Sequence, residues 1–106
     1  MGTSRRPRSR DRGHPLRTLR LAELLRLELD HLFREELQDP LLSGVSPTVV
    51  ELHGGVATVH LQAPPGNLPL RRAALERATP FLRSRLSEAL NLKRTPLLRF
   101  LPVTMT

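Results

Sequence analysis

The sequence predicts a single small α+β domain in which helices cover one face of a three-stranded sheet. Three observations indicate this class. Residues 17–37 carry a leucine pattern with helical spacing, two alternating segments flank a Gly-Gly pair at positions 54 and 55, and a basic helical segment precedes a last alternating segment at residues 97–103. A chain of 106 residues is long enough for one core and too short for two. The expected order is helix, strand, strand, helix, kink, helix, strand.

The first helix is expected over residues 17–37. Its apolar residues recur at spacings of three and four, as on a helix with one buried face: Leu21, Leu25, Leu29, Leu32, Phe33 and Leu37. Leu24 and Leu27 widen this stripe, so we expect the helix to lie broadly across a sheet. Pro40 ends it.

A β-hairpin is expected around Gly54-Gly55, because two glycines form a favoured two-residue turn. That turn sets Leu52 opposite Ala57, Val50 opposite Val59 and Thr48 opposite Leu61. One face of the ribbon is then almost wholly apolar, which supports the register. We expect Val50, Leu52, Val59 and Leu61 in the core, and Glu51, Thr58 and His60 toward solvent.

Pro80 interrupts the basic helical segment that runs from Arg71 to Leu86. A proline removes a backbone donor, crowds the carbonyl group of Glu76, and disfavours the helical conformation at Thr79. We therefore expect two helices, with Thr79 as the N-cap of the second and Pro80 as its first residue. The expected inward residues are Leu70, Ala74 and Ala78 in the first half and Leu82, Leu86, Ala89 and Leu90 in the second.

The last strand is expected at residues 97–103, with Leu98 and Phe100 pointing inward. Residues 1–15 form a basic, disordered arm, or a stretch upstream of the true start. Residues 16–103 then form the folded domain, and residues 104–106 a short C-terminal tail.

The net charge of +7 is unevenly distributed. Residues 16–68 hold four Arg and seven acids, whereas residues 69–94 hold seven Lys or Arg and two acids. Such segregation is typical of a phosphate-binding face. The candidate nucleic-acid-binding residues are Arg71, Arg72, Arg77, Arg83, Arg85, Lys93 and Arg94. An ordinary helical pair with a solvated arginine face remains the alternative for this segment.

Residues that would support catalysis or metal binding are missing. There is no cysteine, the four histidines lack zinc-like spacing, and no phosphate-binding glycine loop occurs, so we expect no enzyme, no metal and no cofactor. With three Phe, no Tyr and no Trp, RNA recognition would depend on phosphates and shape. Phe81, next to the kink, is either exposed or packed in the core beside Leu82, and we favour the core. No apolar run is long enough to cross a membrane, so a cytoplasmic location is expected.

Three stretches resemble the ribosome-binding factor A family, a family of bacterial small-subunit assembly factors. They are Asp39-Pro40 with the strand Val50-Glu51-Leu52, the segment from Ala74 to Arg83, and the segment from Leu90 to Phe100. The resemblance covers residues 16–101 in order. Pro80 stands where the family usually has Gly, and the acidic residues that often follow the last strand are absent from residues 102–106.

This resemblance implies a type II KH-like fold whose usual Gly-x-x-Gly loop is replaced by an interhelical kink, Ala78-Thr79-Pro80. It also implies binding to the immature small ribosomal subunit and its 16S rRNA during late maturation, with support of 5′-end processing and of growth in the cold. We expect a monomer. The alternative is a protein-interaction module that dimerises through the leucine-rich first helix.

Overall fold

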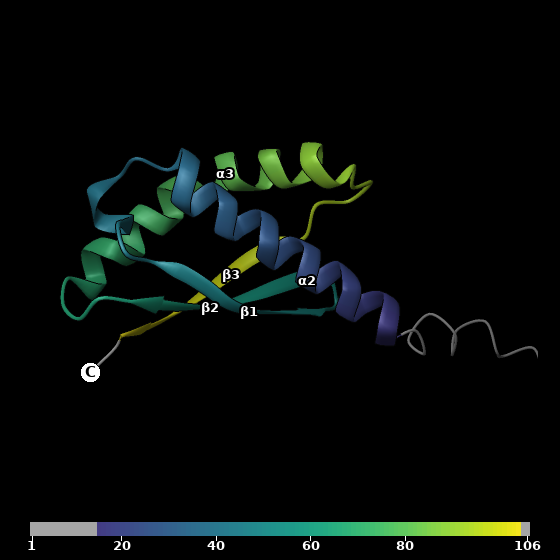
Figure 1. The fold of residues 1–106 in the computed structure, drawn as a ribbon, viewed down its shortest axis with the longest axis horizontal. Coiled ribbons are helices and arrows are strands. Elements are labelled where there is room, and N and C mark those ends of the chain that lie inside the picture. The colour runs from purple at the N-terminus through teal and green to yellow at the C-terminus, as the bar shows by residue number, and fades with distance from the viewer. Residues whose placement is uncertain (1–14, 105–106) are drawn as a thin grey trace, which may run out of the picture.

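The chain folds into a three-stranded sheet with two long helices on one of its faces (Figure 1). The computed structural model describes residues 15–104, so the predicted arm lies outside the described residues except for Pro15. The elements are α2 (Pro15–His31), the π-helical turn η2 (Leu32–Glu36), the 3₁₀ turn η3 (Pro40–Leu42), β1 (Ser46–His53), β2 (Val56–Ala63), α3 (Leu68–Leu90) and β3 (Leu97–Thr104).

The strand order is β1-β2-β3, so β2 is the central strand. It pairs antiparallel with β1 and parallel with β3. Antiparallel strands can be joined by a tight turn, whereas parallel strands need a long crossover, and α3 provides it. The predicted α+β class, with helices on one face of three strands, is confirmed. The last strand reaches Thr104, one residue further than predicted.

The predicted hairpin turn is confirmed. Gly54 and Gly55 both have positive φ, 57° and 81°, which a two-residue hairpin turn of this kind requires. Leu52 pairs with Ala57, and Val50 with Val59, as predicted.

The predicted pairing of Thr48 with Leu61 is wrong. The register shifts between Pro47 and Val49, so Pro47 lies opposite Leu61 and Thr48 is the extra residue of a bulge. Pro47 is buried and Thr48 is exposed. The bulge thereby buries an apolar ring instead of a hydroxyl group, and the Thr48 hydroxyl donates to the carbonyl oxygen of His60 at 3.1 Å.

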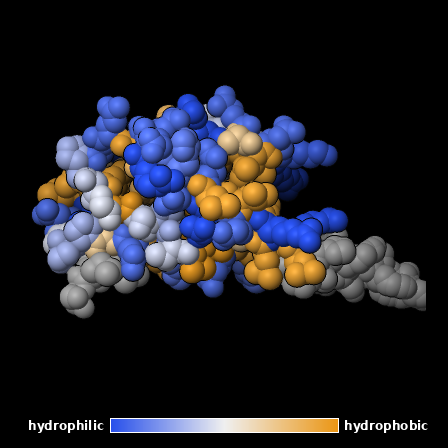
Figure 2. Space-filling view, in the orientation of Figure 1, coloured by the Kyte–Doolittle hydropathy of each residue, from blue (hydrophilic) through white to orange (hydrophobic). Residues whose placement is uncertain are grey.

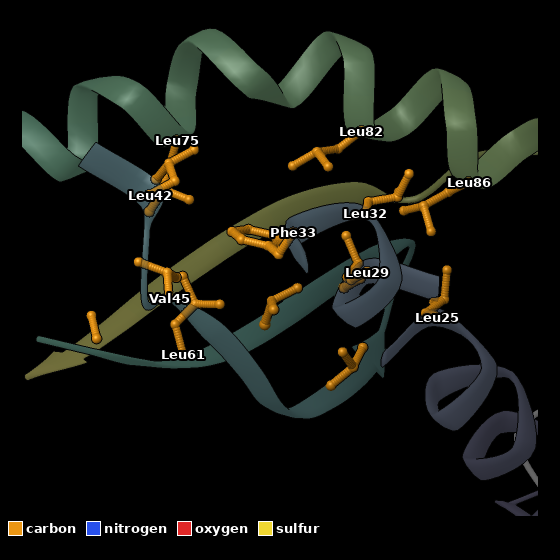
Figure 3. Packing of buried hydrophobic residues seen from close by; sticks show 14 of the residues in the cluster. Leu25, Leu29, Leu32, Phe33, Leu42, Val45, Leu61, Leu75, Leu82 and Leu86 are labelled. Carbon is orange, nitrogen blue, oxygen red and sulfur yellow. The ribbon is translucent and has the colours of Figure 1, made fainter. Parts of the chain in front are cut away.

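The core lies between the helices and the inner face of the sheet (Figure 3). Leu25, Leu29 and Leu32 meet Leu82 and Leu86 there, and all five are fully buried. The rings of Phe33 and Phe100 pack edge to face, with centroids 6.3 Å apart. Val50, Val59 and Leu61 are buried and Leu52 is partly buried, so the predicted inner face of the hairpin is confirmed. Leu98 and Phe100 also pack on this core, as expected.

The first α-helix is shorter than predicted. It ends at His31 and continues as a single π turn, in which the amide of Leu37 donates to the carbonyl oxygen of Leu32 at 2.9 Å. Pro40 begins the 3₁₀ turn η3 rather than ending the helix directly, and the carboxylate of Asp39 caps that turn by accepting from the amide of Leu41 at 2.9 Å.

Leu24 and Leu27 do not widen the buried stripe. They are 48% and 50% exposed, and Leu16 and Leu19 near the start of α2 are also exposed. Hydrophobic residues therefore appear on the outer surface over α2 (Figure 2). The helix contacts the core along a narrow face only.

The predicted break at Pro80 is also wrong in one respect: α3 is a single helix with Pro80 inside it. Its axis changes direction near the middle (Figure 1). Thr79 is not an N-cap, because its hydroxyl donates back to the carbonyl oxygen of Leu75 at 2.8 Å. Proline crowding and this kind of threonine bond both bend helices without ending them.

The inward face of α3 begins with a charged residue. Leu70 is 56% exposed and Arg71 is only 4% exposed, so Arg71 occupies the inward position that we expected Leu70 to fill. Ala74 and Ala78 follow inward as predicted, whereas Ala89 is exposed. Within residues 15–104, no helix is long and apolar enough to cross a membrane.

Candidate nucleic-acid interface

The outer surface of α3 is set by its buried residues. Ala74, Leu75, Leu82 and Leu86 face the core, which turns the opposite side of the helix to solvent along its whole length. Pro80 lies on this outer side and is exposed, whereas Ala78 and Thr79 are partly buried. The predicted kink residues thus lie at the bend, and only Pro80 is open to a ligand.

Arg72, Lys93 and Arg94 are the exposed members of the predicted basic set that lack internal partners. Neither an ion pair nor a side-chain hydrogen bond is formed by any of them within the described residues. Arg72 lies in the second turn of α3, and the other two lie in the connection from α3 to β3. These three cations are free to meet phosphates.

Arg83 has a structural role. Its Nε donates to the carbonyl oxygen of Pro96 at 3.1 Å and its Nη2 donates to that of Thr95 at 2.9 Å. The guanidinium group therefore fixes the end of the connection that carries Lys93 and Arg94. Bonds from a charged donor to main-chain carbonyls are stronger than neutral ones.

Arg77 and Arg85 are paired with acids. Arg77 Nη2 lies 3.3 Å from a carboxylate oxygen of Asp39, and Arg85 Nη2 lies 3.0 Å from one of Glu36. Both side chains stay well exposed, at 63% and 42%, so each pair is a weak surface contact that a phosphate can displace. The pairs tie α3 to η2 and to the Asp39 loop.

Phe81 does not occupy the core position that the sequence analysis favoured. It is 38% exposed, and the guanidinium carbon of Arg85 lies 5.6 Å from its ring centroid. This is a cation–π contact on the surface. A helical projection of the sequence indicates this exposure. Consecutive residues of a helix point in different directions, so Phe81, directly before the buried Leu82, lies at the edge of the inward face.

A shallow hollow lies between the second half of α3 and the connection to β3. Its volume is about 420 Å³, and its lining residues are Pro80, Arg83, Ser84, Ser87, Glu88 and Thr95. The hydroxyl groups are donors suited to phosphate oxygens, and Lys93 and Arg94 directly precede Thr95 in the sequence. Sequence reasoning missed Ser84 and Ser87, although their spacing from Pro80 places them on the same side of the helix.

The structure thus divides the seven predicted residues. Arg72, Lys93 and Arg94 are free on the surface, Arg77 is exposed and Arg85 partly buried with both paired to acids, Arg83 supports the loop, and Arg71 is buried. Among the described residues, no group of three or more His, Cys, Asp or Glu is arranged to hold a metal ion.

Residues 17–102 match the family model described as "Ribosome-binding factor A". A protein of that name from Heliobacterium modesticaldum is 39% identical over 93 residues, which cover 84% of this chain and 75% of the relative. Another, from Phenylobacterium zucineum, is 40% identical over 107 residues, covering 92% of this chain and 74% of the relative.

Solved structures give the same answer. The crystal structure of ribosome-binding factor A from Thermus thermophilus matches with a TM-score of 0.73 and 29% identity, covering 80% of this chain and 93% of that one. A model of the Thermus thermophilus factor fitted into the cryo-EM map of a 30S–RbfA complex matches with a TM-score of 0.57 and 31% identity, covering 74% and 90%. The type II KH-like fold that the sequence resemblance implied is therefore confirmed.

Proposed function

Because this chain belongs to the ribosome-binding factor A family, we propose that it binds the small ribosomal subunit through the outer face of α3 and the connection to β3. Family membership also supports the prediction that the protein is an assembly factor and not an enzyme. The observation that carries the choice of face is the pair of free cations Lys93 and Arg94, which directly precede Thr95 at a hollow that Ser84, Ser87 and Glu88 also line. Arg72 is a third free cation, at the other end of α3.

Phosphate contacts supply the binding energy in this proposal. Arginine and lysine release counterions when they neutralise RNA phosphates, so affinity falls as salt rises. Arg77 and Arg85 extend the same face once their carboxylate partners are displaced. Phe81 adds an exposed ring on which a base can stack. The ligand is the 16S rRNA of an immature subunit.

Sedimentation with purified small subunits tests this proposal. The wild-type protein should comigrate with subunits at low salt and leave them at high salt. Lys93→Glu with Arg94→Glu should weaken comigration strongly. Arg17→Glu with Arg20→Glu is the matched control, because these two arginines are exposed on α2 and outside the proposed face. Equal binding by the two double variants would exclude this face.

The role in late maturation, the support of 5′-end processing and the support of growth in the cold are proposed from the same family membership. A strain that lacks the protein should accumulate 16S rRNA with unprocessed 5′ ends at low temperature. Restoration by the wild-type protein and not by the Lys93→Glu, Arg94→Glu variant would connect this effect to the proposed face. Restoration by both the wild-type protein and the variant would show that 5′-end processing does not depend on the proposed face.

A second candidate function is a protein contact through α2. The observation that favours it is the set of exposed leucines on that helix: Leu16, Leu19, Leu24 and Leu27. Light scattering separates the two candidates, because a protein that dimerises through α2 should have twice the monomer mass, and Leu24→Glu with Leu27→Glu should return it to the monomer. A monomer mass for the wild-type protein would exclude dimerisation through α2 and leave RNA binding as the remaining candidate.

A further inference from the structure

Arg71 is the buried charged residue of the described chain. It is 4% exposed, and its Nε and Nη1 atoms are enclosed without a hydrogen-bond partner. No described carboxylate lies within ion-pair distance of it. An arginine stays charged at any physiological pH, so it cannot escape this situation by losing its proton. A buried charge without a partner is costly, and an anion bound beside it would lower that cost.

The start of α3 also lacks a negative partner. Asn67 precedes the helix but forms no side-chain cap, and no acid occurs in the first turn. Pro69 has no N–H, and the amides of Leu68 and Leu70 have no main-chain acceptor among the described residues. Free amides at the positive end of a helix dipole bind anions.

These two features lie at the same place. Arg71 is the fourth residue of α3, and its amide closes the first turn by donating to the carbonyl oxygen of Asn67 at 2.8 Å. Side chains on a helix lean toward its N-terminus, so the side chain of Arg71 leaves the helix in the direction of the first turn. The residues of the preceding loop, 64–67, are all exposed, so this loop can shift with little loss of buried surface.

We propose that the N-terminus of α3 is a binding site for one oxyanion of the phosphate type, held by the Arg71 guanidinium group and the amides of Leu68 and Leu70. A shift of the loop at residues 64–67 gives the anion access to the enclosed nitrogens Nε and Nη1. The phosphate can be a free ion or a phosphate of the RNA backbone. The RNA source rests on the proposed function, whereas the free-ion source does not.

Inorganic phosphate added to the full chain tests the site directly. At equal ionic strength, phosphate should raise the thermal midpoint above its value in chloride, and it should shift the amide signals of Leu68 and Leu70 in a saturable way. Arg71→Met should lose both responses while keeping a midpoint in chloride at least as high as that of the wild type, because it removes an unpaired buried charge. Arg20→Met, at an exposed arginine of α2 outside the proposed face, should keep both responses.

The outcomes separate clearly. A wild-type protein that responds equally to phosphate and chloride, or an Arg71→Met variant that keeps the response, would overturn the site. A lower chloride midpoint for Arg71→Met would show that water or main-chain groups already satisfy the guanidinium, which also overturns it.

Binding to small subunits distinguishes the two sources of phosphate. If the site holds an RNA phosphate, Arg71→Met should reduce the slope of log affinity against log salt by about 0.7 to 0.9, the value for one phosphate on a nucleic acid. If Arg71→Met leaves the slope unchanged while the wild-type protein responds to inorganic phosphate, the site is assigned to the free ion. If the wild-type protein does not bind subunits at all, the proposed function fails while the phosphate titration still decides on the site.

Discussion

The hydroxyl group of Thr79, the residue directly before Pro80, donates to the carbonyl oxygen of Leu75 at 2.8 Å, one turn back in α3. A threonine that bonds backward in this way bends a helix slightly, and a proline at the next position crowds the carbonyl group of Glu76. Two neighbouring residues therefore favour the same bend. Leu75 and Leu82, on either side of it, are both buried in the core and fix the two halves of the helix.

This arrangement predicts that the bend survives the loss of either cause and weakens when both are lost. Spin labels at the exposed positions Arg72 and Glu88 report the distance between the two halves of α3. Pro80→Ala and Thr79→Val should each leave this distance unchanged, and the double variant should lengthen it. An unchanged distance in the double variant would mean that packing alone sets the bend.

Arg83 is predicted to contribute to stability more than to binding. Arg83→Met removes two charged hydrogen bonds to the carbonyl groups of Thr95 and Pro96, and should lower the free energy of unfolding by about 1.5 to 3 kcal/mol. Urea denaturation measures this. The control is Arg72→Met, which changes an exposed arginine of the same helix and should be nearly neutral. Equal midpoints for the two variants would contradict the structural role of Arg83.

The two faces of the hairpin predict different costs for the same substitution. Val59 is fully buried on the central strand, so Val59→Ala should lower the free energy of unfolding by about 2 kcal/mol. Val49 lies on β1 at 48% exposure, and Val49→Ala should cost much less. Denaturant midpoints compare the pair directly, and a similar loss in both would mean that the open face of the sheet is covered in solution.

Gly44 and Gly66 form a matched pair for backbone strain. Both have left-handed φ, 81° and 87°, which a residue with a Cβ adopts at a cost of about 1 kcal/mol or more. A Cβ on Gly44 would lie 3.0 Å from the Cγ of Pro64, whereas nothing lies within 4 Å of one on Gly66. Gly44→Ala should therefore destabilise more than Gly66→Ala in thermal unfolding. The reverse order would show that the Pro64 ring yields easily.

The sequence predicted the hairpin well because its signals were local. The Gly-Gly turn and the alternation on both sides indicated the register near the turn, and the structure confirms it at Leu52 and Val50. The bulge at Thr48 could not be predicted, because one inserted residue changes which side chain faces inward without changing the composition. Its cause is the burial of Pro47 in place of Thr48, which depends on the packing around it.

The basic helix was predicted less well because its phase was chosen by residue type. Counting back in fours from Leu82, Ala78 and Ala74 leads to Leu70, whereas two full helical turns back from Ala78 lead to Arg71. An arginine is rarely expected inside, but the helical repeat is the better signal, because Arg71 is buried and Leu70 is exposed. The roles of Arg77, Arg83 and Arg85 depend on partners distant in the chain, and charge counting cannot supply these.

The parallel pairing of β3 with β2 means that the sheet can be completed only late in translation. While the chain is being translated, α2 and the hairpin emerge first and can associate, but one edge of β2 stays open until the strand beyond α3 has left the ribosome. Because α3 is held to the sheet partly through Arg83 and the residues just before β3, its outer face also takes its final shape late. Under the proposed function, this face can therefore bind a maturing subunit only after β3 has been made.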